Sequence, residues 1–222
     1  MPRPGAPLAA ALGLVLALSL AGTPGWTQGA QAHGAVVSWR ELRYTGVVAQ
    51  SDWYTCGPAA AATLLDHYFG IRATEAEMLE AALHAMGASG LEPGAGVTAY
   101  ALVRALSERG LPVRGYRVQR DDLATYFQQG GLPVILHVTR PEDHYVVAVG
   151  SLGQWVLLAD PSWGRRIVSW DELVMEKGYS GVVLVPVPTA ELAAAAMARQ
   201  AEALVWAADR LSQLERWGGS WR

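Results

Sequence analysis

Three short apolar runs separated by turn-forming residues make up the stretch PVILHVTRPEDHYVVAVGSLGQWVLLAD, residues 133–160. The runs cover 133–139, 145–150 and 155–160, and their length and content of Val, Ile and Leu favour β-strands. A few polar residues with Gly or Pro separate each run from the next, which is typical of hairpins. The stretch therefore predicts an antiparallel sheet in the C-terminal half of the chain.

Upstream of this stretch, the sequence has the signals of helices. Residues 58–69 place Pro58 in a first helical turn and end before Gly70, and Thr74-x-x-Glu77 is a capping box. We expect further helices at 74–86, 98–109, 121–128 and after Ser169, and further strands at 46–49, 113–118, 166–169 and 182–187. Helices followed by strands predict an α+β fold, with the N-terminal helices packed on the C-terminal antiparallel sheet.

Composition limits what the chain can be. It has 222 residues, of which 51% are hydrophobic and 17% charged, which is typical of one globular domain with appendages and excludes a disordered chain. A net charge of −3 gives no electrostatic reason to expect nucleic acid as a partner. One cysteine excludes a disulfide framework and a multi-cysteine zinc site, and we expect neither a metal nor an organic cofactor.

The N-terminus has the pattern of a secretory signal. An uncharged apolar run at 8–21 follows Arg3, and the small-x-small pattern Ala30-Gln31-Ala32 comes after it. We expect a signal peptide over the first 32 residues, cleaved near Ala32, and a protein exported to the periplasm or the medium. The apolar run is shorter than the ~20 residues that span a bilayer, which makes an uncleaved membrane anchor the weaker alternative.

The C-terminus differs from the predicted domain at 33–188. Residues 189–222 form an alanine-rich extension with one long helix expected at 190–217. Four apolar residues recur at intervals of three and four, as on one helical face: Leu204, Ala207, Leu211 and Leu214. The helix either docks on its own domain or mediates self-association or binding of a partner, and both alternatives stay open.

The single cysteine, Cys56, stands directly before Gly57-Pro58 and the first predicted helix. A helix N-terminus carries partial positive charge and unpaired N–H groups, which stabilise a thiolate, the nucleophilic form of cysteine. Gly57 removes side-chain bulk, so that a substrate carbonyl could approach. Exported proteins seldom keep an unpaired thiol, which favours a chemical use for this one. The alternative is a small buried residue at a helix start.

A nucleophilic cysteine needs a base, and the chain has five histidines. His33 lies near the expected mature N-terminus, His84 is predicted on a helix surface, and His137 is expected to be a hydrogen-bonded sheet residue. His67 follows the cysteine by 11 residues on the same helix, about 16 Å away and too far to serve. His144 starts a predicted strand after a polar turn, where substrate can reach it. His144 is therefore the candidate base.

A hairpin centred on Leu152 would place Asp160 opposite His144. Opposed residues have Cβ atoms about 4.5–5.5 Å apart, so that the carboxylate could orient the imidazole and stabilise its protonated form. Two alternatives stay open. A bulge at Gly153 would shift the pairing by one residue, and Asp160 could simply begin a turn.

Further candidates lie around the cysteine. Gln50 precedes Cys56 by six residues, and its amide could donate to the oxyanion of an acyl-transfer intermediate, beside the backbone N–H of Cys56. Trp53 and Tyr54 either line a substrate cleft, where a narrow wall would favour glycine, or serve only in packing. Gly57, already discussed, and Tyr145 are the other candidates for the cleft.

Three motifs carry a resemblance to a known family: Gln50-x5-Cys56-Gly57-Pro58-Ala59-Ala60, Asp143-His144-Tyr145-Val146-Val147 and Asp160-Pro161-x-x-Gly164. They resemble the bacteriocin-processing peptidases, a papain-like family (peptidase family thirty-nine) that cuts leader peptides after a double glycine. Over about residues 40–187, the resemblance implies a papain-like α+β fold. It also implies Cys56 as nucleophile, His144 as base and Asp160 as its orienting group. Gln50 would then lie in the oxyanion hole.

This chain departs from transporter-linked members of that family, because we expect it to be a stand-alone protein located outside the cytosol. We therefore expect no ATP, and a peptide or protein as substrate. Stand-alone exported relatives occur beside fibre-forming and pilus-like systems, which suggests periplasmic processing. The sequence favours an exported cysteine endopeptidase that cuts a glycine-rich or double-glycine leader-like segment of a secreted protein. The rivals are a catalytically silent adaptor and another acyl transferase or amidase, such as a transglutaminase-like enzyme.

Overall fold

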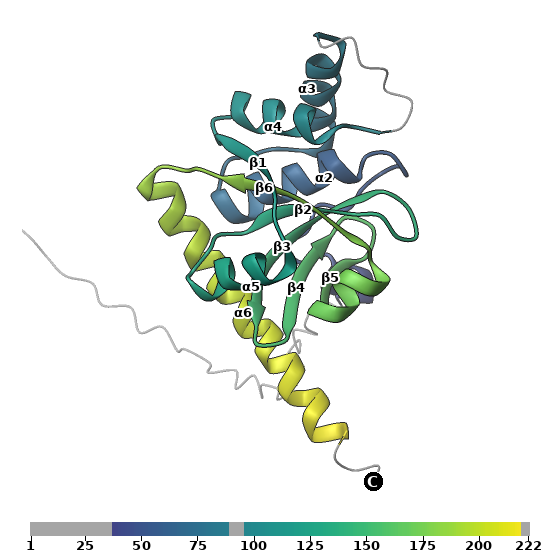
Figure 1. Cartoon of the computed structure of the whole chain (residues 1–222), viewed down its shortest axis with the longest axis vertical. Helices are drawn as coiled ribbons and strands as arrows, with labels where there is room; N and C mark the ends of the chain where they lie inside the picture. Colours follow the sequence, from purple (N-terminus) through teal and green to yellow (C-terminus); the bar gives the residue numbers. More distant parts are fainter. Residues whose placement is uncertain (1–36, 89–95, 219–222) are drawn as a thin grey trace, which may run out of the picture. The chain divides into compact units, whose positions relative to one another are not determined.

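The structure is a computed structural model that describes residues 37–88 and 96–218 (Figure 1). The expected signal peptide and its cleavage site near Ala32 lie outside the described residues, so both stay predictions. Among the helices that are described, none combines the length and the apolar character needed to cross a membrane.

An antiparallel sheet forms the centre of the fold. Within the described ranges it has six strands in the order β1-β6-β2-β3-β4-β5 (Figure 1). The strands are β1 Val113–Arg117, β2 Val134–Val138, β3 His144–Leu152, β4 Trp155–Asp160, β5 Gly164–Ser169 and β6 Tyr179–Pro186. Every neighbouring pair is antiparallel, which confirms the predicted sheet.

Helices cover both faces of this sheet. The described helices are α1 Trp39–Arg43, α2 Cys56–Ala62, α3 Glu75–Ala88, α4 Ala99–Glu108, α5 Arg120–Gln128 and α6 Ala190–Gly218, with the π-helical segments η1 Thr63–Phe69 and η2 Glu172–Glu176. On one face, α2, η1, α4 and α6 pack over the sheet, and α3 packs on α2 and α4. On the other face, α5 and η2 cover a second apolar cluster. The predicted α+β fold is therefore confirmed.

Helix α2 and segment η1 form one continuous helical stretch that begins at Cys56, two residues earlier than expected. All residues of α2 are buried, and its alanines lack bulk, so the helix lies close against β3. Gly70 ends η1 in the left-handed conformation, with φ of 70°, as the sequence predicts. The capping box that precedes α3 is present, since Thr74 N donates to Glu77 Oε2 at 2.8 Å.

The strand expected at 46–49 is wrong. This segment contacts the start of η1 and the β4–β5 turn without joining the sheet. Val48 N donates to the side chain of Thr63, at 2.9 Å, and Gln50 N donates to the carbonyl of Pro161, at 3.0 Å. Because these isolated partners take its N–H groups, the segment forms no ladder.

The hairpin between β3 and β4 has a different register from the one expected. Leu152 pairs with Trp155, so the turn consists of Gly153 and Gln154, and Gly153 has a positive φ of 58°. The expected register centred on Leu152 is therefore shifted by three places. The prediction that His144 and Asp160 stand directly opposite each other in the ladder is therefore wrong.

A bulge in β3 nevertheless brings these two residues to one face. The register skips Val149, between the pairs Ala148–Leu158 and Gly150–Leu157. Because successive strand residues face opposite sides, one extra residue moves Asp160 from the far face to the face of His144. Asp160 is then level with Val146, two places from His144, and such diagonal neighbours are within reach of long side chains.

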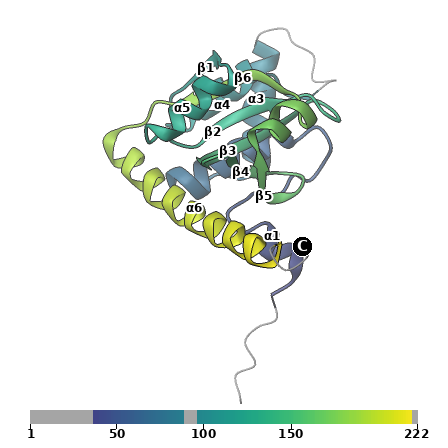
Figure 2. The ribbon, with the colours of Figure 1, turned by 60° about the horizontal axis from the view of Figure 1, so that its bottom comes forward.

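The predicted C-terminal helix is confirmed as α6, a single helix of 29 residues (Figure 2). It packs on η1 and β3 of its own domain, with Ala196 and Ala207 fully buried. Leu204 and Leu211 are half-buried, whereas Leu214, at 67% exposure, lies off the docked face. Self-association or binding of a partner through this helix stays a prediction.

Candidate active site

Cys56 is the first residue of α2, and its side chain is only 7% exposed. The turn before the helix is held locally, because Thr55 Oγ1 donates to the carbonyl of Asp52 at 2.9 Å. Asp52 N donates back to Thr55 Oγ1 at 3.1 Å. The thiol therefore lies in the first turn of a buried helix, where the helix dipole favours a negative charge.

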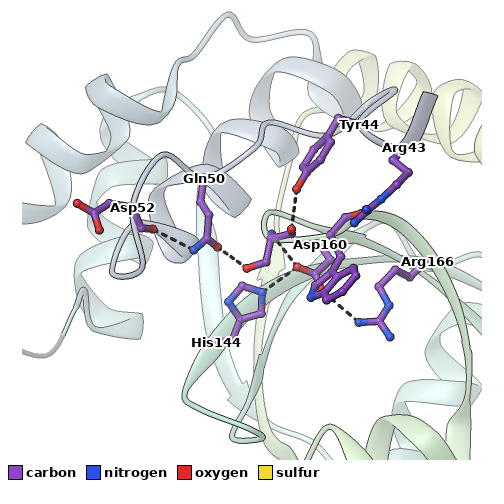
Figure 3. A network of polar contacts seen from close by, with 9 residues as sticks. Arg43, Tyr44, Gln50, Asp52, His144, Asp160 and Arg166 are labelled. Carbon is purple, nitrogen blue, oxygen red and sulfur yellow. Dashed lines mark hydrogen bonds and ion pairs between the residues drawn. The ribbon is translucent and has the colours of Figure 1, made fainter. Parts of the chain in front are cut away.

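His144, the first residue of β3, and Asp160, the last residue of β4, form a hydrogen-bonded pair (Figure 3). His144 Nε2 lies 2.9 Å from Asp160 Oδ1, which also accepts from the backbone N–H of Ser162 at 2.8 Å. Arg166 Nη1 lies 3.8 Å from Asp160 Oδ2. The other ring nitrogen of His144 is left for Cys56, which lies close enough to raise the pKa of the imidazole. The structure thus brings together the three residues that the sequence singled out.

Electrostatics favour the charged forms of this pair. Burial lowers the pKa of His144, but hydrogen bonds to Asp160 and Cys56, and the charges of both groups, outweigh it and raise the pKa to about 9. Burial raises the pKa of Asp160, yet the His144 hydrogen bond and charge, the Ser162 N–H and Arg166 hold it below its usual value. At neutral pH the pair is therefore an imidazolium and a carboxylate.

Gln50 contacts the turn that follows Asp160. Its Nε2 donates to the carbonyl of Asp52 at 2.9 Å, and its Oε1 accepts from the hydroxyl of Ser162 at 2.8 Å (Figure 3). A backbone carbonyl can only accept, so the amide has one orientation. Ser162 therefore contacts both Asp160, through its backbone N–H, and Gln50, through its hydroxyl. The oxyanion role of Gln50 stays a prediction.

The end of α1 and the residue after it hold the turn that follows Asp160, and no sequence pattern indicates this contact. Tyr44 Oη donates to the carbonyl of Ser162 at 2.6 Å, and Arg43 Nε donates to that of Trp163 at 2.8 Å (Figure 3). Gly164 has a φ of 81°, and a Cβ there would lie 2.3 Å from the carbonyl oxygen of Arg43. This close approach explains the glycine of the Asp160-Pro161-x-x-Gly164 motif.

A cleft of about 470 Å³ opens at the cysteine. Its lining residues are Trp53, Tyr54, Cys56, Gly96, Val97, His137, Glu142, Asp143 and Tyr145. Three cleft candidates from the sequence therefore share one cleft with the thiol: Trp53, Tyr54 and Tyr145. Trp53 is 66% exposed, which argues against a purely structural role for it.

Packing provides a reason for the fourth cleft candidate, Gly57. A Cβ at this buried position would lie 2.7 Å from Val97 Cγ2 and 3.2 Å from Tyr145 Cδ2. The missing side chain therefore lets two cleft residues pack against the start of α2. Contact of Gly57 with a substrate stays a prediction.

His137 is a cleft residue that the sequence argument missed. It has the hydrogen-bond partner expected of a sheet histidine, because its Nδ1 lies 3.1 Å from Ser180 Oγ. Its ring also lies 4.9 Å from that of Tyr145, and burial lowers its pKa. The register pairs His137 with Tyr145, so the alternation of β2 and β3 was the signal that could have found it.

Two further histidines of the described ranges, His67 and His84, do not line the cleft. His84 is exposed, as expected, and His67 lies near the end of η1. His33 lies outside the described residues. In the described part of the chain, no three His, Cys, Asp or Glu side chains gather as metal ligands.

A helix that carries a cysteine, set against a sheet that carries its histidine, is the plan of papain-like cysteine peptidases. A model of the Peptidase C39 family matches residues 44–191, so the chain belongs to this family. It is therefore a cysteine peptidase that acts on a protein substrate. Nearly all of α6 lies beyond the matched residues.

Two Pseudomonas proteins are similar to this chain. The "Probable functional amyloid protease FapD" of Pseudomonas aeruginosa is 28% identical over 163 residues, which are 73% of this chain and 69% of the relative. The protein of the same name from Pseudomonas fluorescens is 31% identical over 180 residues, which are 77% and 76% of the two chains.

Solved structures have the same fold. The peptidase domain of Streptococcus ComA, a bi-functional ABC transporter involved in a quorum-sensing pathway, superposes with a TM-score of 0.54 and 25% identity, covering 64% of this chain and 98% of that domain. A double glycine motif protease from an AMS/PCAT transporter, solved with its leader peptide, superposes with a TM-score of 0.53 and 24% identity, covering 64% and 91%. The papain-like fold is confirmed.

Proposed function

We propose that the protein is an exported endopeptidase that cuts a glycine-rich, double-glycine leader-like segment of a secreted protein. Cys56 is the nucleophile, His144 the base, Asp160 its orienting group and Gln50 an oxyanion donor. One observation carries these assignments: buried Asp160 holds His144 at 2.9 Å, and Cys56 lies close enough to raise the pKa of the same imidazole. Such a chain of three groups fixes the tautomer of the imidazole and its charge.

The proposed reaction is an acyl transfer to water. His144 holds the proton of Cys56 as the imidazolium, and the sulfur, as the thiolate, attacks the scissile carbonyl carbon. Gln50 Nε2 uses one hydrogen on Asp52, and the second donates to the oxyanion together with the backbone N–H of Cys56. His144 then protonates the leaving amine, and the C–N bond breaks. Water attacks the acyl-enzyme and gives its proton to His144, which releases the acid and the thiol.

The substrate is inferred from the cleft and from similar proteins. Trp53, Tyr54 and Tyr145 give the cleft aromatic walls, which favour small residues next to the cut bond. The AMS/PCAT protease is described as acting on a double glycine motif, and the Pseudomonas relatives are named as functional amyloid proteases. Both descriptions support a glycine-containing segment of a secreted, fibre-forming protein. Export is supported by the pattern of the first 32 residues.

The experiment incubates wild type and Cys56→Ala with proteins encoded nearby or secreted with the enzyme, and maps products by mass spectrometry. We expect cleavage after glycine by wild type alone, and slower cleavage when that glycine is replaced by alanine. Cleavage that survives in Cys56→Ala would exclude this nucleophile. A cross-linked product would indicate transfer to an amine, and binding without any reaction would indicate an adaptor. Edman sequencing of the periplasmic protein tests export, with His33 as the expected first residue.

A further inference from the structure

Two adjacent residues of α6 contact the two elements that carry the site. Arg199 Nη1 donates to the carbonyls of Asp66 and His67, both at 2.9 Å. These carbonyls belong to η1, the continuation of the helix that begins at Cys56. Carbonyls in the last turn of a helix lack partners within it, so Arg199 supplies both a hydrogen bond and a favourable charge.

Gln200 makes the second contact, with the strand that begins at His144. Its Nε2 donates to the carbonyl of Val149 at 2.7 Å and to that of Gly131 at 2.8 Å, which uses both amide hydrogens. Val149 is the residue that the β3–β4 register skips. Gln200 is only 8% exposed, so these are buried hydrogen bonds to the bulge that sets the face of Asp160.

The approach of α6 to β3 depends on a glycine beside the bulge. A Cβ at Gly150 would lie 3.2 Å from Leu204 Cδ1 and 3.3 Å from Gln200 Nε2. From β5, the guanidinium of Arg165 lies 4.0 Å from the ring centre of Trp206 on the same helix. Helix α6 is therefore fitted to this site on the sheet.

We propose that α6 is a brace between the α2–η1 helix and strand β3, and that Arg199 and Gln200 are positioning residues for the pair of Cys56 and His144. The proposal rests on the proposed function, since it assumes that this pair does the chemistry. Between the two elements themselves, the packing is apolar and non-directional. Hydrogen bonds from one rigid helix to both backbones are directional, and they fix where each element lies along the other.

The experiment compares Gln200→Leu and Arg199→Met with Gln213→Leu, the same chemical change at an exposed position of α6. The readouts are the rate of alkylation of Cys56 by iodoacetamide across pH, and the NMR titration of His144, in the full chain. We expect alkylation at neutral pH to slow about tenfold in Gln200→Leu and about threefold in Arg199→Met, since a misplacement of about 1 Å can cost up to ~100-fold. The pKa of His144 should fall from about 9, and Gln213→Leu should match wild type.

Failure of the brace and failure of the proposed function give different results. Alkylation in His144→Ala as fast as in wild type would contradict the catalytic pairing itself. If His144→Ala is slow but Gln200→Leu and Arg199→Met both match wild type, only the brace is overturned. Equal slowing in Gln213→Leu would also overturn it, because the effect would not be specific. Gln200→Asn, whose shorter amide cannot reach both carbonyls, replaces Gln200→Leu if circular dichroism shows that the leucine variant is unfolded.

Discussion

The site has two sides that are built differently. On one side, Cys56 and Asp160 are 7% and 5% exposed, and a buried helix and a strand ladder hold them. On the other side, Gln50 lies on a segment outside the sheet, and an exposed serine 112 residues away fixes its amide. The first side is set by core packing and the second by side-chain hydrogen bonds near solvent. We therefore expect changes on the first side to cost more than changes on the second.

The largest effect is expected for Cys56→Ala, which should abolish cleavage. Without the sulfur no acyl-enzyme forms, and loss of a nucleophile costs on the order of 10⁶-fold in comparable enzymes. The fold should persist, since alanine is small and apolar, with a change of less than about 1.5 kcal/mol in the free energy of unfolding. Product mapping and urea denaturation check both parts, and a large loss of stability would show that the cysteine also has a structural role.

Asp160→Asn should be next, with kcat lower by about 10²–10⁴-fold. The amide keeps the shape but loses the charge, so the pKa of His144 should fall from about 9. A pH–rate profile and NMR titration measure both effects. Asp209→Asn is the matched control, because that carboxylate is exposed on α6 and does not line the cleft. Equal effects of the two substitutions would contradict the role of Asp160.

Gln50→Ala tests the solvent-exposed side, and kcat should fall by about 10²–10³-fold with KM little changed. Alkylation of Cys56 by iodoacetamide forms no oxyanion, so its rate should stay that of wild type. Asp160→Asn should slow both reactions. If Gln50→Ala slows alkylation as much as it slows hydrolysis, the residue acts on the thiol and not on the oxyanion.

The stability of the buried side should depend on pH. The pKa of His144 is raised in the fold to about 9 from an ordinary 6.5. A raised pKa gives stabilisation that is complete below about pH 6.5 and lost as pH rises through about 9. The difference in unfolding free energy between wild type and His144→Gln should therefore shrink between those values, as measured by urea denaturation. A constant difference would mean that the imidazole is neutral throughout.

Ser162→Ala should have the smallest effect and lower kcat about threefold. This factor corresponds to the small net free energy that one exposed hydrogen bond contributes. The backbone N–H that holds Asp160 is retained, so the pH–rate profile should not move. In the Gln50→Ala background, Ser162→Ala should have no further effect, because the serine acts through that amide. Ser107→Ala, on the exposed face of α4, is the control for loss of a hydroxyl.

The sequence predicted the elements of the buried side better than their exact alignment. Helix signals around Pro58 and Gly70, and the apolar runs of the sheet, give the positions of Cys56 and His144. The predicted register that pointed to Asp160 is wrong by three places at the turn. Asp160 still reaches His144, because the bulge at Val149 brings both side chains to the same face of the sheet. No local pattern marks this bulge, since the group that bonds its carbonyl lies 51 residues further along the chain.

The solvent-exposed side was only partly predictable. The spacing of Gln50 from the cysteine indicated a role, but the residues that hold it gave no periodic signal. Tyr44 and Ser162 act through single hydrogen bonds between distant segments. Hydrophobic patterns report burial, so contacts of this kind are known only when the fold is known.

The bulge in β3 makes the number of residues in this hairpin matter as much as their identity. Loss of Val149 alone would remove the bulge and leave Ala148 opposite Leu158, so the Asp160 carboxylate would stay on the side of His144. Loss of a second residue from β3 between His144 and Gly150 would shift the pairing by one and turn the carboxylate to the opposite side of the sheet, although every catalytic residue would still be present in the sequence. This part of β3 should therefore tolerate the loss of one residue, whereas the loss of two should inactivate the enzyme.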